Sequence, residues 1–224
     1  RRNRESLCRT RFQRRCEFPE GEPIRRGRGV GPRRSGRWSH RRVGDCGENR
    51  RDGAISLKSI NVLVNNAGIF FTKPFTDYTA EDFKSLVSTN LEGFLYVTQL
   101  SIKQMLGQKT GGSIVTITAS LARNPIRGVT AAVPMITKGG LETITQHLAM
   151  EYAKDGIRVN AVAPGAVYTP LHRETPKDVM ESLSPMGRPS TVKDITDAVM
   201  YLTDAETVTG DILYVDGGAH FGRW

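Results

Sequence analysis

The stretch Ile60-Asn-Val-Leu-Val-Asn-Asn-Ala-Gly68 decides the fold that we expect for this chain. Residues 60–65 are short, apolar and rich in β-branched side chains, which is typical of a strand buried on both faces of a sheet. Asn65-Asn-Ala-Gly68 follows with small and amide-bearing residues, so the backbone can approach a ligand closely and the amides can tie neighbouring strand ends together. Taken alone, the same residues also fit an ordinary turn from a strand into a helix.

Strands and amphipathic helices alternate along the rest of the chain. Thr79 with Asp82, and Thr191 with Asp194, have the spacing of capping boxes, in which side chains satisfy the free N–H groups at a helix start. We expect further strands at 113–118, 157–163 and 211–215, and helices at about 79–106, 135–153 and 191–202. Residues 170–190 carry four prolines and predict a loop with one short helical piece.

This order of elements predicts the fold class. Strands that alternate with long helices indicate a parallel sheet covered on both faces, and right-handed crossovers favour a doubly wound, Rossmann-like, three-layer α/β domain. The 224 residues suit one such domain. No apolar run reaches the roughly 20 residues of a membrane-spanning helix, and no signal-peptide pattern is present, so we expect neither a membrane protein nor a fibre.

The composition changes abruptly near residue 53. Residues 1–52 hold 17 Arg, no Lys and no Ala, with a net charge of +10, whereas residues 53–224 have a net charge of −1. Only 10 residues of the first part are apolar, too few to offset the entropy of ordering it. We therefore expect an Arg-rich, disordered or out-of-frame segment at 1–53 and a Rossmann-like domain at 54–224.

Three explanations of the Arg-rich segment stay open. It is a basic arm that binds nucleic acid, a natural disordered leader, or an out-of-frame reading of a GC-rich coding region. We favour the third, because such a reading gives Arg, Gly, Pro and Ser without Lys or Ala, and because few aromatic residues accompany the arginines. The other two frames upstream of codon 53 test this hypothesis, since one of them should encode a strand followed by a glycine-rich turn.

The cysteines do not form a recognisable metal or disulfide pattern. All three (Cys8, Cys16 and Cys46) lie in the Arg-rich segment, without CxxC spacing and with only His40 nearby. We expect no metal site. We also expect a cytoplasmic location, because the rest of the chain has no cysteine.

Five motifs in a fixed order resemble a known family. They are Asn65-Asn-Ala-Gly68, Ser120 after the next strand, Lys138 in the following helix, Pro164-Gly165 after a third strand, and the ending Gly210-Asp-Ile-Leu-Tyr-Val-Asp-Gly-Gly218. On these motifs, residues 57–224 resemble the short-chain dehydrogenase/reductase family. The resemblance implies hydride transfer between NAD or NADP and an alcohol, ketone or aldehyde, in a homodimer or homotetramer built on the two long helices.

The resemblance implies three catalytic residues, Ser120, Lys138 and Asn90. Ser120 comes just after a strand, where open α/β sheets bind ligands, and its hydroxyl would orient the substrate oxygen. Thr118 offers a second hydroxyl, but we prefer Ser120 because it lies at the mouth of the site. Lys138 would bind the nicotinamide ribose, and Asn90 would hold a helix kink and a water of the proton relay. A helix cap at Ser120 and a structural amide at Asn90 are the plainer explanations.

The Tyr-x-x-x-Lys pattern of the family is broken here. Tyrosine one helical turn before lysine faces the same cleft, and the ammonium lowers the phenol pKa, which makes the phenol a usable acid. In this chain the residue four before Lys138 is Pro134, which has no proton to transfer and suits a helix start. Tyr168 is one alternative donor; Ser120, a bound water or a substrate hydroxyl are others, unless the step is slow or absent.

Cofactor contacts are implied by the resemblance for Asn66, Ala67, Gly68, Lys138, Pro164, Gly165, Val167 and Thr169. Residues 170–190 would form a substrate lid that carries His172 and Met180. The first strand, glycine-rich turn and helix that hold the pyrophosphate in the family have no counterpart, because no apolar strand precedes the glycine-rich stretch 27–36. The sequence therefore does not choose between NAD and NADP.

Three functions follow from these features. The chain is an active oxidoreductase on a small carbonyl or alcohol, a catalytically defective relative with weak or no cofactor binding, or a nucleic-acid binder that uses the Arg-rich segment. Pro134 and the missing turn favour the second over the first for this chain. Without front strands, the strand at 60–65 would keep an exposed edge, so we expect poor solubility or partial folding.

Overall fold

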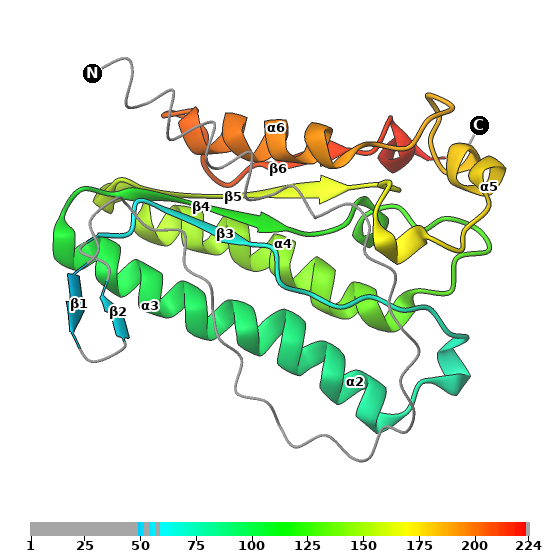
Figure 1. The fold of residues 1–224 in the computed structure, drawn as a ribbon, viewed down its shortest axis with the longest axis horizontal. Coiled ribbons are helices and arrows are strands. Elements are labelled where there is room, and N and C mark those ends of the chain that lie inside the picture. The colour runs from blue at the N-terminus through cyan, green and yellow to red at the C-terminus, as the bar shows by residue number, and fades with distance from the viewer. Residues whose placement is uncertain (1–48, 52–53, 57–58, 223–224) are drawn as a thin grey trace. The chain divides into compact units, whose positions relative to one another are not determined.

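The computed structural model describes residues 49–51, 54–56 and 59–222 (Figure 1). The Arg-rich segment with its cysteines, the stretch 27–36 and the expected boundary at 53 lie outside the described residues. β1 (Asn49–Arg51) and β2 (Ala54–Ser56) pair antiparallel as a two-stranded sheet. The elements that form the candidate site all come after residue 59.

Four parallel strands form the main sheet. They are β3 (Val62–Asn65), β4 (Gly112–Ile117), β5 (Ile157–Pro164) and β6 (Ile212–Val215), in the order β3-β4-β5-β6. The four predicted strands are confirmed, with ends that move by one or two residues. β4 ends at Ile117, so the two candidate hydroxyls, those of Thr118 and Ser120, both lie after the strand. In the described part of the chain, β3 pairs with β4 only and β6 with β5 only, so these two are the edge strands.

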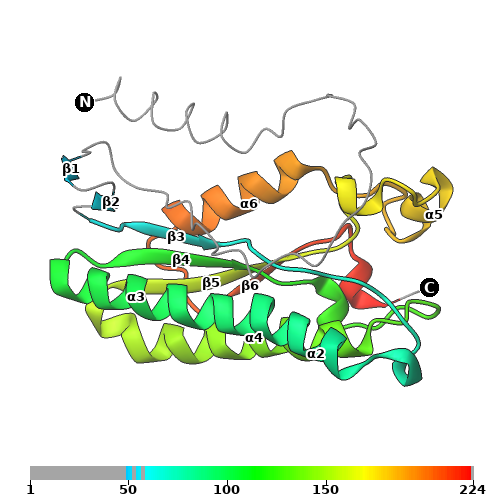
Figure 2. The ribbon, with the colours of Figure 1, turned by 60° about the horizontal axis from the view of Figure 1, so that its bottom comes forward.

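Helices cover both faces of this sheet (Figures 1 and 2). α3 (Gly93–Gln108) and α4 (Ala132–Tyr152) lie on one face, and α6 (Val192–Asp204) lies on the other. The core has a cluster on each side of the sheet: Ile102, Met105, Ala149, Ile114, Ile157 and Val159 on the first, and Val199, Leu202, Val115 and Val162 on the second. The three-layer, Rossmann-like α/β fold is thereby confirmed.

The helix predicted over 79–106 is not continuous. α2 (Ala80–Leu86) runs into a π-helical turn (Val87–Glu92), and α3 begins directly after it. A π-helical turn is rare and often occurs at functional sites. Asn90 is the buried residue of this turn, and its side-chain contacts, described below, supply a reason for the interruption.

Both predicted capping boxes are confirmed. The hydroxyl of Thr79 accepts from the backbone of Asp82, and the Asp82 carboxylate accepts from the backbone of Thr79 at 2.9 Å. Thr191 and Asp194 make the same pair of contacts at the start of α6. The helix starts at these two places follow from local side-chain chemistry.

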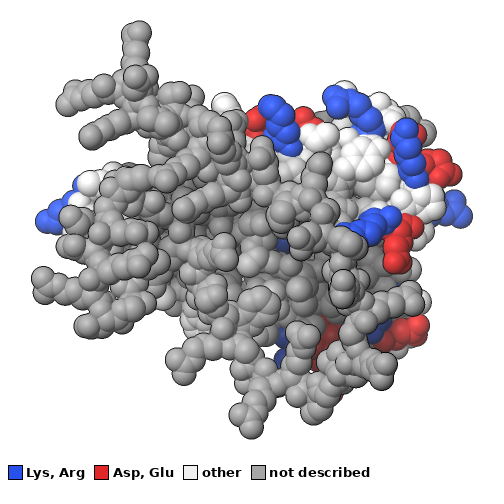
Figure 3. All heavy atoms as spheres, viewed as in Figure 1, with Lys and Arg blue, Asp and Glu red and all other residues white. Residues whose placement is uncertain are grey.

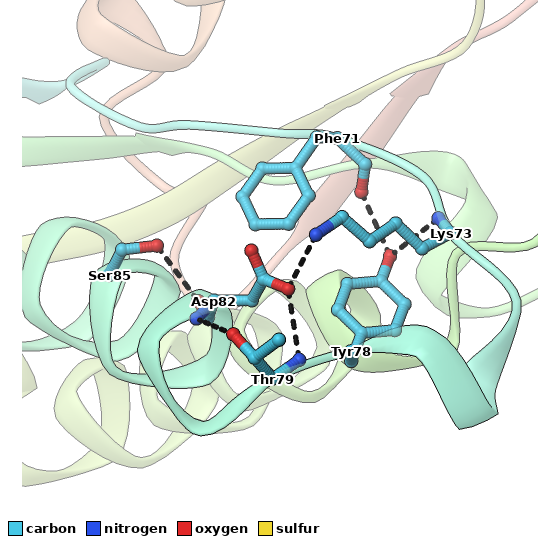
Figure 4. Close-up of polar contacts among 6 residues, drawn as sticks. All are labelled: Phe71, Lys73, Tyr78, Thr79, Asp82 and Ser85. Carbon is cyan, nitrogen blue, oxygen red and sulfur yellow. Dashed lines mark hydrogen bonds and ion pairs between the residues drawn. The ribbon is translucent and has the colours of Figure 1, made fainter.

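The loop from β3 to α2 folds back onto the first of these caps (Figure 4). Lys73 Nζ lies 2.6 Å from Asp82 Oδ2 and over the ring of Phe71, and the hydroxyl of Tyr78 donates to the Phe71 carbonyl at 3.0 Å. The hydrogen bond from Lys73, followed by that from the backbone of Thr79, lowers the pKa of the Asp82 carboxyl.

α4 begins at Ala132, three residues before the predicted start, so Pro134 is the third residue of the helix. N–H groups in the first turn have no acceptor within the helix, and a proline there removes no helical hydrogen bond. The loop at 170–190 contains one short helix, α5 (Lys177–Ser182), as predicted. Short 3₁₀ turns complete the chain: η1 (Phe75–Asp77), η3 (Ser120–Ala122), η4 (Ala153–Asp155), η5 (Pro170–His172) and η6 (Ala219–Phe221).

The surface of the described residues carries mixed charge. Figure 3 shows Lys and Arg beside Asp and Glu where that face is described, which agrees with the net charge of −1 for residues 53–224. Among the helices of the described residues, none is both long enough and apolar enough to cross a bilayer.

Candidate active site

The candidate site lies at the carboxyl ends of β3, β4 and β5. Asn65 is the register partner of Thr116, which in turn pairs with Ala161, so the three parallel strands end side by side. Open α/β sheets place ligands at this edge. The expectation that the amides tie strand ends together is wrong for Asn65, whose Nδ2 donates instead to Thr98 Oγ1 of α3 at 3.0 Å.

Asn90 joins three parts of the chain through one side chain. Its Oδ1 accepts from the backbone N–H of Ile69 at 2.8 Å, and its Nδ2 donates to the Ile69 carbonyl at 3.1 Å and to Thr137 Oγ1 at 3.0 Å. The exit of β3 is therefore fixed against the π-helical turn and against α4. Because the amide is buried, these partners also replace the water that it loses on folding.

Gly68 lies between Asn90 and Lys138. A Cβ atom at this position would be 3.3 Å from Asn90 Oδ1 and 3.5 Å from Lys138 Nζ. The missing side chain keeps open the space beside the amine. Asn66 and Ala67 precede this glycine in the same exposed turn after β3.

Lys138 places its amine against the end of β4. Nζ donates to the carbonyl oxygen of Ile117 at 2.8 Å. Burial lowers the pKa of this amine from 10.5 to about 8, because the protonated form loses water that one carbonyl does not replace. A sizeable fraction of the amine is therefore neutral near physiological pH.

Pro134 lies one helical turn before Lys138 on α4 and is buried. The Pro134 carbonyl accepts a hydrogen bond from Thr137 Oγ1 at 2.8 Å, and this side-chain contact stabilises the first turn of the helix. The place that holds a phenol in the Tyr-x-x-x-Lys pattern is thus taken by an apolar ring with no proton to give.

Of the two candidate hydroxyls, that of Thr118 makes hydrogen-bonding contacts with other protein groups. Its Oγ1 lies 3.1 Å from Glu142 Oε1 and 3.3 Å from the Val162 carbonyl. Ser120 opens the turn η3, is buried, and makes no side-chain hydrogen bond with the described residues. The preference for Ser120 as the hydroxyl that orients a ligand stays a prediction.

Glu142 is a neighbour of the site that the sequence reasoning did not name. It lies one helical turn after Lys138, and burial raises the pKa of its carboxyl, against the opposing effects of the Thr118 hydroxyl and the charge of Arg123. The spacing of four residues from Lys138 is the signal that could have identified it.

The segment after β5 is held by close backbone packing. A Cβ atom on Gly165 would lie 2.6 Å from Cβ of Asp216, so the end of β5 approaches the end of β6 closely at this glycine. The N–H of Gly165 donates to the Val215 carbonyl at 3.1 Å, and Val167 forms an isolated bridge with Ser190. Pro164 is the last residue of β5.

The expected lid lines an open hollow of about 450 Å³. Thr169, Tyr168, His172 and Met180 are among its lining residues, so four residues named from the sequence meet there. Burial lowers the pKa of His172, which favours the neutral imidazole. No hydrogen bond within the described residues joins Tyr168 to the Lys138 amine, and its role as an alternative donor stays a prediction.

These residues fit one half of a nicotinamide dinucleotide. The space at Gly68 and the underhydrated amine of Lys138 suit a ribose with its hydroxyls. Within residues 59–222, however, no glycine-rich turn leads from a strand straight into a helix N-terminus, which is what a pyrophosphate requires. The described residues likewise hold no cluster of three or more His, Cys, Asp or Glu that could bind a metal.

Known proteins resemble the chain over this region. The family model described as enoyl-(acyl carrier protein) reductase matches residues 53–220. A tropinone reductase homologue of Arabidopsis thaliana is 40% identical over 167 residues, which cover 71% of this chain and 62% of that protein. Senescence-associated protein 13 of the same plant is 36% identical over 190 residues, 78% of this chain and 69% of that protein. The chain thus spans about 62% of the length of the first of these relatives.

Solved structures share the fold. ElxO with bound NADP is 29% identical with a TM-score of 0.68, over 72% of this chain and 68% of that chain. A gluconate 5-dehydrogenase from Burkholderia cenocepacia, in complex with NADP and tartrate, is 29% identical with a TM-score of 0.68, over 74% of this chain and 66% of that chain. With the family model matched over residues 53–220 and the ordered motifs on the ends of β3, β4 and β5, this chain belongs to the short-chain dehydrogenase/reductase family of oxidoreductases.

Proposed function

We propose that the site between β3, β4 and α4 binds a nicotinamide dinucleotide with a small alcohol, ketone or aldehyde, and that hydride transfer between them is its reaction. The observation that carries this proposal is the meeting of Gly68, Asn90 and Lys138. A Cβ on the glycine would lie 3.5 Å from the Lys138 amine, which donates to the Ile117 carbonyl, and the Asn90 amide holds the backbone beside it. A bound nicotinamide would supply or accept the hydride.

Each candidate residue has a role in this proposal. Lys138 Nζ would donate to the ribose hydroxyls, and the hydroxyl of Ser120 would orient the substrate oxygen. Asn90 would keep the exit of β3 in place. Asn66, Ala67, Pro164, Gly165, Val167 and Thr169 would line the cofactor. The NADP bound to two of the similar structures supports NADP as the first dinucleotide to test.

Pro134 favours a second candidate, a relative that binds substrates of this class but turns them over slowly or not at all. General acid catalysis typically contributes 10²–10⁴-fold to a rate, and Pro134 has no proton to supply. The lack of a pyrophosphate cradle in the described residues also supports weak dinucleotide binding.

Fluorescence titration with NADPH and NADH, followed by turnover of a panel of small ketones and alcohols, tests both candidates. We expect weak binding and low turnover for the chain itself. Pro134→Tyr should raise turnover at least about 100-fold over Pro134→Phe, which has a similar ring but no hydroxyl. If neither dinucleotide changes the fluorescence of the folded chain or of Pro134→Tyr, the oxidoreductase proposal fails.

We also propose a cytoplasmic homodimer or homotetramer, with small-molecule substrates as the other partners. Apolar side chains are exposed on both long helices, including Leu95, Tyr96, Leu100, Ile136 and Met150. Such side chains support self-association through α3 and α4. Light scattering should give at least a dimer for the chain and a smaller species for Leu100→Glu.

A further inference from the structure

The hollow at the lid segment combines positive charge with hydrogen-bond donors. Figure 1 shows α5, which contributes to its lining, beyond the carboxyl ends of the strands. The polar residues around its volume of about 450 Å³ are Arg173, Lys177, Tyr168, Thr169, His172 and Thr175. The acidic residues of the same described segment, Glu174, Asp178 and Glu181, do not line it. The lining is therefore suited to a negatively charged group.

Arg173 is the cation of the hollow that is left without an ion pair among the described residues. The other cation, Lys177, has its Nζ 3.5 Å from Glu181 Oε1. A planar guanidinium can donate two parallel hydrogen bonds to a carboxylate or a phosphate. Since residues 53–224 have a net charge of −1, this cation is not part of a generally basic surface. Arg173 thus offers a local site for an anion.

Two backbone hydrogen bonds fix the polar side chains around the hollow. The N–H of His172 donates to the Thr169 carbonyl, and the N–H of Thr175 donates to the His172 carbonyl, both at 3.0 Å. Thr169 is the N-cap of η5, yet its hydroxyl does not cap the turn. Burial lowers the pKa of His172, which favours a neutral imidazole that still donates one hydrogen bond. These side chains can bind the oxygens of an anion beside Arg173.

The rest of the lining is apolar. Met180, which is 1% exposed, and Pro170 line the hollow together with the polar residues, so a short carbon chain can bind there beside an anionic group. Thr169 follows Gly165, at the end of β5, by four residues, and four extended residues span at most about 14 Å. The hollow therefore begins close to the edge of the sheet where we place the reaction.

We propose that the lid hollow binds an anionic group of the substrate, so that the substrates of this chain are small ketones, aldehydes or alcohols that carry a carboxylate or a phosphate. Arg173 donates charge-assisted hydrogen bonds to this group, Thr169 and Thr175 add hydroxyl donors, and Met180 contacts the carbon chain. The inference rests on the proposed function for the reaction at the carbonyl, and it narrows the substrate class of that site.

NMR titration of the whole chain without dinucleotide tests the anion preference directly. Two matched pairs of probes are compared: levulinate with its neutral methyl ester, and dihydroxyacetone phosphate with dihydroxyacetone. We expect at least one anionic probe to bind about tenfold or more tightly than its neutral counterpart, and added salt to weaken that binding. The pair that shows the preference tells a carboxylate from a phosphate.

Three variants assign the preference to the hollow. Arg173→Gln should abolish it, whereas Arg188→Gln, which removes the same charge from an exposed residue outside the lining, should keep it. Glu181→Gln should strengthen anion binding severalfold, because it releases the Lys177 ammonium from its ion pair. Weaker or unchanged binding in Glu181→Gln overturns the contribution of Lys177.

The inference fails if neither anionic probe is preferred or if the preference persists in Arg173→Gln. It also fails if inorganic phosphate binds as tightly as the anionic ketones, since the carbon chain then contributes nothing. Preferred binding of an anionic ketone by a chain that turns over no substrate would keep this inference and contradict the proposed hydride transfer. Turnover of neutral ketones without any anion preference would do the reverse.

Discussion

The side-chain amide of Asn90 donates a 3.0 Å hydrogen bond to the hydroxyl of Thr137, the residue directly before Lys138. The same amide holds both backbone groups of Ile69, directly after Gly68. One side chain thus fixes the distance between the exit of β3 and the helix that carries the candidate lysine.

Loss of this amide should destabilise the chain strongly. Asn90→Ala leaves the backbone N–H and carbonyl of Ile69 without their side-chain partner, and each unsatisfied buried group costs roughly 1–3 kcal/mol. We expect the free energy of unfolding to fall by about 3 kcal/mol in urea titrations. Thr137→Val, which removes only one of the partners, should cost about 1 kcal/mol, and equal effects of the two variants would contradict this account.

The buried amine of Lys138 makes stability depend on pH. Its pKa is about 8 in the folded chain and 10.5 for an unperturbed lysine, so between these values the unfolded chain binds more protons and the free energy of unfolding rises with pH. Below pH 8 the charged amine costs the folded state about 3 kcal/mol. Lys138→Met should therefore be more stable than the parent chain by up to about 3 kcal/mol at pH 7, and by little above pH 10.5.

Urea unfolding at several pH values measures this difference. The exposed Lys154 provides the control, since Lys154→Met removes a solvent-exposed side chain and should change stability little. A gap between Lys138→Met and the parent chain that does not narrow as the pH rises would contradict the pKa assigned to the buried amine.

Removing either of the two capping threonines should lower the free energy of unfolding by a similar amount. Thr79→Ala and Thr191→Ala each remove a hydroxyl that accepts from the third residue of a helix, at a cost of about 1 kcal/mol in the free energy of unfolding. Asp82→Asn should also destabilise the chain at neutral pH. The pKa of Asp82 is lowered on folding, so its stabilisation is present above 3.8 and is lost as the pH falls below that value. A loss that persists at pH 2 would argue against the ion pair with Lys73.

Two glycines should respond oppositely to substitution by alanine. At Gly165 the new Cβ would lie 2.6 Å from Asp216, so the ends of β5 and β6 must move apart, at a cost of about 2 kcal/mol. At Gly139, inside α4, nothing lies within 4 Å of the new atom, and the higher helix propensity of alanine should stabilise the chain by up to about 1 kcal/mol. Thermal unfolding of both variants checks the signs.

The strands and helix starts could be predicted from the sequence because their causes are local. The apolar, β-branched run before Asn65 forms β3, and threonine three residues before aspartate marks the starts of α2 and α6. The change of Tyr to Pro134 is likewise visible in the sequence, since the spacing from Lys138 identifies the position. These features depend on residues that are neighbours in the sequence, so the pattern of the sequence is enough to predict them.

Only the tertiary structure decided the π-helical turn, the partner of Asn65, the contacts of Thr118 and the lowered pKa of Lys138. Asn90 widens its helix where it meets Ile69 and Thr137, which are far away in the sequence, and Thr118 is engaged because Glu142 of a later helix lies beside it. Burial and hydrogen bonding depend on which segments meet in space. The sequence alone therefore proposed candidate residues for the site, whereas their contacts and charge states, and the presence of Glu142 beside Thr118, depend on how β3, β4 and α4 pack together.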